Sequence, residues 1–186
     1  MGNIYRISGI KDATIIESTG DTVDIPYGNV ITVGPEFETI TYEGDGVQQN
    51  DYYGLRVGGT IGGDKWSEDV LEALYSKTAA TSGTGIDDIE STRYYMGDDA
   101  ELTPTQVGLR VDFSAINDST EAAATIRMTV FKTRVAPFVP PEGANAAKFA
   151  PLSFTWTAEK TSTDIEGNAL PGVPTGGAFY AISVLS

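Results

Sequence analysis

The chain has 186 residues, of which 40% are hydrophobic and 20% are charged, and its formal net charge is −14. It contains neither cysteine nor histidine, which excludes a disulfide framework, a Cys/His zinc site, a thiolate nucleophile and an imidazole-dependent catalytic triad. Nucleic-acid phosphates are bound by lysine and arginine, and this chain has 12 such residues against 26 acids, so nucleic-acid binding is disfavoured.

These values suit a single globular domain over residues 1–186, and we expect it to need no metal and no cofactor. No run of the sequence comes near the roughly 20 apolar residues of a membrane span, and the N-terminal segment shows no signal peptide. We therefore expect a soluble protein that stays where it was synthesised and has no membrane partner.

The first part of the chain predicts short strands separated by turn residues. Strand-like runs cover Ile4–Ile10, Ala13–Glu17, Thr22–Ile25 and Val30–Val33. A turn is predicted at Ser18–Asp21, where small polar residues and a glycine separate the second run from the third.

A hairpin with a long polar connection follows. Phe37–Tyr42 and Tyr52–Thr60 each alternate between side chains fit for a core and side chains fit for water. The connection contains acids and glycines but no basic residue, which is unusual on a small domain unless the loop touches something. It covers residues 43–51, and the residues that we assign to such a contact are Glu43, Gly44, Asp45, Gly46, Gln48, Gln49, Asn50 and Asp51.

One amphipathic helix is predicted after the hairpin. Trp66, Val70 and Leu74 recur at helical spacing, and Asp64 can serve as the N-cap. A helix of about three turns would lay its apolar side against a sheet, which we interpret as ordinary core packing.

Two clusters of acids, Ile86–Glu90 and Met96–Glu101, follow the helix. Calcium takes several carboxylate oxygens, so a calcium site is one interpretation of this segment. The spacing does not match an EF-hand, however, and we favour a solvated acidic face.

The second half predicts longer strands with clear alternation. Apolar and polar residues alternate over Val107–Phe113, Thr125–Thr133 and Leu152–Ala158, and a closing strand is expected at Ala178–Leu185. With the earlier elements, this pattern favours a mainly β, sandwich-like or barrel-like domain with one packed helix.

A basic stretch stands out in this acidic chain. Arg127, Lys132 and Arg134 all fall between Ala122 and Pro141, where no acid occurs. They either pair with acids of the same chain or contact an acidic loop of a neighbouring copy, and the residues alone leave both alternatives open.

The order of these elements resembles the major tail protein, or tail tube protein, of bacteriophages with long non-contractile tails. The likeness covers most of the chain and rests on the order of its elements and their residue patterns more than on any one diagnostic motif. It is carried by Tyr42–Gly46 at the hairpin connection, Gly58–Thr60 with the helix Trp66–Tyr75 after it, Thr92–Met96, Arg127–Arg134 leading to Ala136–Phe138, and Leu152–Ala158 before a short final strand.

The resemblance implies two packed antiparallel sheets with a helix on the flank. In that family six copies form a ring, the inner sheets join into a continuous β-barrel, and stacked rings form a tube through which double-stranded DNA passes without specific binding. The extended hairpin loop, here Glu43–Asp51, would reach a neighbouring ring. Expected partners are copies of the chain itself and other tail proteins such as the tape measure, tail terminator and tail tip. The expected location is the virion tail, assembled in the host cytoplasm.

A tube for DNA must not bind its cargo, and net negative charge with hydroxyl-bearing strand faces suits that requirement. By alternation, the candidates for lumen-facing residues are Thr39, Thr41, Ser153, Thr155 and Thr157. The alternative for each of them is the polar outer face of a monomeric sandwich.

Other classes of protein stay open. A carbohydrate- or surface-binding β-sandwich of another virion component would use Tyr52–Tyr53, Tyr94–Tyr95 or Trp156 as stacking platforms. Against this, Trp156 is in register with Leu152 and Phe154, which favours a place in the core. The tube protein of a contractile injection system is a near relative of the tail tube. A glycosidase with paired carboxylates needs no histidine, but 26 acids offer many such pairs, so we expect no enzymatic activity.

Overall fold

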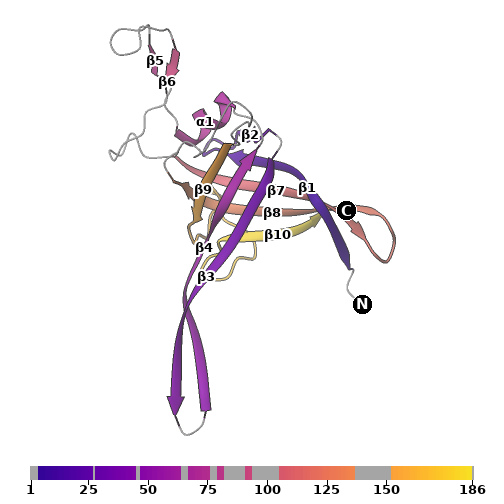
Figure 1. Cartoon of the computed structure of the whole chain (residues 1–186), viewed down its shortest axis with the longest axis vertical. Coiled ribbons are helices and arrows are strands. Elements are labelled where there is room, and N and C mark those ends of the chain that lie inside the picture. The colour runs from indigo at the N-terminus through magenta and orange to yellow at the C-terminus, as the bar shows by residue number, and fades with distance from the viewer. Residues whose placement is uncertain are drawn as a thin grey trace, which may run out of the picture.

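Strands make up most of the described chain (Figure 1). In this computed structural model the described residues are 4–26, 28–44, 47–63, 67–75, 79–81, 91–93, 105–136 and 152–185. The strands are β1 (Tyr5–Ile16), β2 (Thr22–Asp24), β3 (Gly28–Gly44), β4 (Val47–Gly63), β5 (Ala79–Thr81), β6 (Ser91–Arg93), β7 (Gln106–Asn117), β8 (Ala123–Val135), β9 (Leu152–Ala158) and β10 (Tyr180–Leu185), and the helix is α1 (Glu68–Tyr75).

Eight of these strands form one antiparallel sheet in the order β2-β1-β7-β8-β9-β4-β3, with β10 also paired to β8, and β5 pairs with β6 separately. The predicted mainly β class with a flanking helix is confirmed. The layers that we expected as two sheets are parts of one continuous sheet. In Figure 1 β9, β4 and β3 cross over β1, β7 and β8, and buried side chains from both parts form one core.

The sheet divides at β8. Thr125–Val130 of this strand pairs with β10, whereas Thr133–Val135 pairs with β9. Between the two segments β8 has one residue more than the opposing stretch of β7, which is a β-bulge. A bulge bends its strand and increases the local twist, so β9 and the strands beyond it leave the direction of β10.

The bulge also explains where the predicted alternation holds. Along β7 the alternation is confirmed, with three fully buried residues, Val107, Leu109 and Val111. Along β8 the alternation changes phase by one residue at the bulge. The buried residues of β8 are, in order, Met128, Val130, Phe131, Thr133 and Val135.

β9 follows its predicted alternation throughout its described side chains. Phe154, Trp156 and Ala158 are buried in the core. The intervening Ser153, Thr155 and Thr157 are exposed. Each large apolar side chain buried in this way stabilises the fold by about 1.5–3 kcal/mol.

β1 is one continuous strand where the sequence predicts two short ones. Register shifts against β7, next to Ile7 and next to Ile10, let the strand bend while its pairing continues. The turn predicted at Ser18–Asp21 is confirmed, because the Glu17 amide donates to the Asp21 carbonyl at 2.9 Å and β2 follows at once.

α1 is shorter than the predicted three turns. Its Val70 and Leu74 are buried as predicted. The Ser67 carbonyl accepts a hydrogen bond from the Leu71 amide at 3.3 Å, so Ser67 takes the N-cap position predicted for Asp64. Asp64 and Trp66 lie outside the described residues. No helix in the described ranges is long and apolar enough to cross a membrane.

The β3–β4 hairpin corrects the prediction of a long polar loop. Pairing continues from Gly28 opposite Gly63 to Gly44 opposite Val47, so Glu43, Gly44 and residues 48–51 are strand residues. Asp45 and Gly46 lie outside the described residues. The hydrogen bonds between the two strands are made by backbone groups, so they form whatever the polarity of the side chains. In sequence terms, an Asp-Gly pair between two alternating runs is a strong signal for a hairpin with a two-residue connection.

Candidate functional site

One end of the main sheet leaves apolar side chains uncovered. Ile7 of β1 is 58% exposed, and Ile182 and Val184 of β10 are 64% and 47% exposed. Figure 1 shows the beginning of β1, the turn between β7 and β8 and the end of β10 gathered at this end of the sheet. We call Ile7, Ile182 and Val184 the uncovered apolar strip.

The strip continues the core side of the sheet. Directly opposite residues of antiparallel neighbours share one face. Ile182 lies opposite Met128, and Ile7 lies opposite Ala115, and both of these partners are buried. The same face is therefore covered over β7 and β8 and left open at Ile7 of β1 and at Ile182 and Val184 of β10.

Two strand edges flank the strip, and neither has a partner strand in the part of the chain that the structure describes. β1 pairs with β2 only over Thr14–Ile16, so its edge from Arg6 to Asp12 faces no described strand. β10 pairs with β8 on one side and with no described strand on the other. An open edge beside apolar residues is a template for a further strand.

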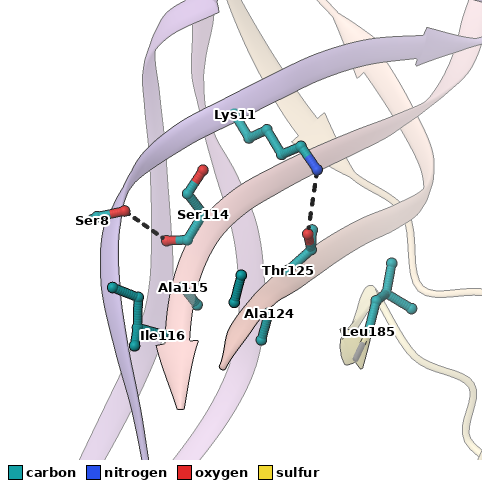
Figure 2. Close-up of a pocket in the computed structure, with 9 residues that line it drawn as sticks. Ser8, Lys11, Ser114, Ala115, Ile116, Ala124, Thr125 and Leu185 are labelled. Atoms are coloured by element: carbon teal, nitrogen blue, oxygen red, sulfur yellow. Dashed lines mark hydrogen bonds between the residues drawn. The ribbon is translucent and has the colours of Figure 1, made fainter. Parts of the chain in front are cut away.

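The opposite face of the same end carries a shallow hollow of about 490 Å³ (Figure 2). Lys11 crosses it, with Nζ 3.5 Å from Thr125 Oγ1, and the Ser8 hydroxyl donates to the Ser114 carbonyl at 3.2 Å. Leu185 forms part of its wall. No carboxylate is among its described lining residues, so it offers no acid–base pair for catalysis.

Arg127, a predicted contact residue, is paired within the chain. Its Nε and Nη2 each donate to a carboxylate oxygen of Asp112 at 2.8 Å. This hydrogen bonding holds the pKa of Asp112 below its usual value and raises that of Arg127, in both cases against the opposite effect of burial. Because Asp112 is buried, removing Arg127 would leave its charge uncompensated.

Lys132 and Arg134 also have partners in the same chain. Lys132 Nζ donates to Thr163 Oγ1 at 2.9 Å, and Arg134 Nε donates to Glu159 Oε1 at 2.6 Å. The ion pairs of Arg127 and Arg134 agree with the first of the two alternatives for the basic stretch, pairing with acids of the same chain, whereas the partner of Lys132 is a hydroxyl. A contact with a neighbouring copy stays a prediction, and Arg134, whose side chain is 64% exposed, is open to one.

The residues predicted to face a lumen do not come together. Ser153, Thr155 and Thr157 share the exposed face of β9. Thr39 and Thr41 lie in β3, in the part of the hairpin beyond the segment of β4 that pairs with β9. The structure therefore supports one exposed hydroxyl row on β9 and leaves the role of all five residues a prediction.

Other sequence-based candidates fall largely outside the described residues. Of the acidic segment 86–101 only β6 is described, and in the described parts of the chain no group of three or more acids is placed to hold a metal ion. Tyr94 and Tyr95 are not described either. Trp156 is 1% exposed and packs in the core, as its alternation predicts, so it offers no surface to a carbohydrate.

The uncovered apolar strip is not among the residues that the sequence singles out. Alternating apolar residues in the closing strand predict a half-buried strand, and nothing in such a pattern shows that its cover is missing. A scan against models of protein families finds none that matches this chain, and a search of curated proteins finds no match. Arguments about function therefore start from the residues and their geometry.

Proposed function

We propose that this protein is a structural subunit that polymerises with copies of itself into stacked rings of six, forming the tail tube of a bacteriophage and a conduit for double-stranded DNA during ejection. The observation that carries the proposal is the open end of the sheet, where the uncovered apolar strip lies between two strand edges. A second copy can cover such a surface, and the resemblance to tail tube proteins supports the arrangement in rings.

Association through this end has a favourable driving force. Burying an apolar side chain of this size contributes about 1.5–3 kcal/mol, and the strip contains three that are about half-exposed or more. The loss of translational and rotational freedom opposes association, so one contact alone gives modest affinity. In a closed ring every copy makes the same contact twice, once with each neighbour, and the ring becomes stable as a whole.

The β3–β4 hairpin is the proposed contact between rings. β9 pairs with β4 only over Gly58–Gly63, and the far half of the hairpin extends away from the rest of the sheet (Figure 1). Residues 37–55 contain several acids and no lysine or arginine. A surface of opposite charge on a neighbouring ring would suit them, and Arg134 is a candidate for it.

A DNA conduit also suits the charge and the chemistry of the chain. A net charge of −14 disfavours binding of phosphate groups, so DNA would pass without being held. We assign the exposed hydroxyl row Ser153, Thr155 and Thr157 to the lumen. The proposed function needs no cofactor and no enzymatic activity, and its partners would be other copies and the tail proteins that fix the length and ends of the tube.

Electron microscopy of the purified protein tests this proposal. We expect rings or tubes that lengthen as the protein concentration rises, with light scattering increasing in parallel. A particle that stays monomeric at every concentration would contradict the proposal. If the native particle that contains this protein has a contractile sheath or a baseplate around the tube, the tube protein of a contractile injection system is the better assignment.

Deleting Gly44–Asn50 tests the role of the hairpin separately. The deletion removes the tip and leaves the pairing of Gly28–Val33 with Gly59–Gly63 next to the core, so the domain should stay folded. We expect single rings at most and no long tubes. Thermal unfolding of the non-assembled deletion variant is the control for folding, and long tubes from this variant would remove the hairpin from the contact between rings.

A further inference from the structure

We infer that β10 of one copy adds to the open edge of β1 of the next copy, so that Val184 of the first copy packs beside Ile10 and next to Ile7 of the second. The inference rests on the proposed self-assembly and names the two strands and the face that carry it. Three features of the two edges within one copy support it: the direction of the strands, their register along the sheet, and the face on which their apolar residues lie.

The directions of the two edges are compatible. β1, β7, β8 and β10 are neighbours in that order, and each strand is antiparallel to the next. β1 and β10 of one copy therefore run in opposite directions. Rotation about an axis that runs along the strands leaves these directions unchanged, so β10 of one copy meets β1 of the next as an antiparallel neighbour, as everywhere else in this sheet.

The two edges overlap in level where Ser183–Leu185 of β10 are level with the open part of β1. One row of opposite residues crosses all four strands and consists of Ile10, Phe113, Ile126 and Val184. Ile7 lies opposite Ala115, two residues further along β7 towards the open end. In a ring of copies at equal height, Val184 of one copy thus arrives beside Ile10 of the next and one core-side position from Ile7. Ile182 is level with Ala13, next to the part of β1 that pairs with β2.

The two edges present Ile7, Ile182 and Val184 on the same face, whereas Leu185 of β10 lies on the opposite face beside the hollow. Ile7 shares the core-side face with Ala115, and Ile182 and Val184 share it with Met128 and Ile126. Between them Ser183 lies on the opposite face, because side chains alternate along a strand. Joining the edges therefore brings Val184 of one copy next to Ile10 and Ile7 of the next on the core-side face and keeps this serine out of the contact.

Cysteine cross-linking tests this arrangement, since the chain contains no cysteine of its own. Two double variants, Ile7→Cys with Val184→Cys and Ile10→Cys with Val184→Cys, are assembled and then oxidised. We expect at least one of them to give a ladder of covalent oligomers on a denaturing gel, which disappears on reduction. The control, Ile7→Cys with Ser183→Cys, should give no ladder, because its two side chains point to opposite faces and cannot meet disulfide geometry.

The outcomes separate this inference from the proposed function. Tubes without a ladder from either pair would overturn the pairing of β10 with β1 and leave the tube. A ladder in the absence of tubes would support the pairing and contradict the tube. A ladder of equal strength from the control pair would show that the contact is not specific to the core-side face and would overturn the inference, and a protein that neither cross-links nor assembles would overturn both.

Discussion

The two ends of the core-side face of the main sheet differ in one respect, which is whether the chain covers its own side chains. At one end, residues of β1, β7 and β8 are buried beneath α1 and the strands that cross over them. At the other end, the uncovered apolar strip has the same residue types on the same face and is about half-exposed or more. The first end stabilises the single chain, and the second holds apolar surface that the described residues leave exposed and that another molecule can bury.

Replacing Trp156 by alanine at the covered end should have the largest effect on the free energy of unfolding. The residue is 1% exposed and central to the core, so we expect a loss of about 3–5 kcal/mol. Chemical denaturation of the non-assembled protein measures it. Thr157→Ala, on the exposed face of the same strand, should change the value by less than about 0.5 kcal/mol.

Replacing Arg127 by methionine should have the next largest effect, because it leaves the buried Asp112 without its ion pair. We expect a loss of about 1–3 kcal/mol in the free energy of unfolding. Arg134→Met, which breaks a much more exposed pair, should cost no more than about 1 kcal/mol. Equal losses from the two variants would show that burial does not distinguish the pairs.

The difference between these arginines also changes how charge reversal tests assembly. Reversing Arg134 to glutamate should impair tube growth with little loss of thermal stability if this residue meets a neighbouring copy. Reversing Arg127 would place a second carboxylate beside Asp112 and destabilise the chain itself, so it cannot serve that test. Unchanged tube growth of the Arg134 variant would place it outside any contact.

Lowering the pH should remove the stabilising contribution of the Asp112–Arg127 ion pair. The pKa of Asp112 is lowered in the folded chain, so its stabilising contribution is present above the usual carboxyl pKa of about 3.9 and is lost as the pH falls through the lowered value. The difference in free energy of unfolding between the native chain and Asp112→Asn should therefore be constant near neutral pH and shrink below about pH 4. A difference that grows on acidification would contradict the assigned ion pair.

Substitutions in the uncovered strip should have the smallest effect on the single chain. Ile182→Ser and Val184→Ser should each change the free energy of unfolding of the non-assembled protein by less than about 0.5 kcal/mol, because these side chains are already in water. Light scattering should nevertheless show that assembly needs a higher protein concentration. Ser183→Ala, on the other face of β10, is the control, and equal assembly of all three variants would contradict a role for the strip.

Much of the fold follows from local pattern. The alternation in β7 and β9 and the spacing of Val70 and Leu74 in α1 identify buried positions correctly, because each pattern has the period of its own element. The hairpin connection is the clearest error. Polar composition suggests a loop over residues 43–51, whereas pairing depends on backbone groups that polar residues carry as well.

The sequence by itself determined the strand-rich class, the absence of thiol and imidazole chemistry, and which side of β7 and β9 enters a core, since composition and periodicity are local properties of the chain. Only the tertiary structure decided that one end of that core side stays open, that β1 and β10 are the edges beside it, and that Arg127 is held by Asp112. The burial of a sheet face, the pairing of its edge strands and the formation of ion pairs depend on segments far apart in the chain. A local sequence pattern does not show which of these segments come into contact.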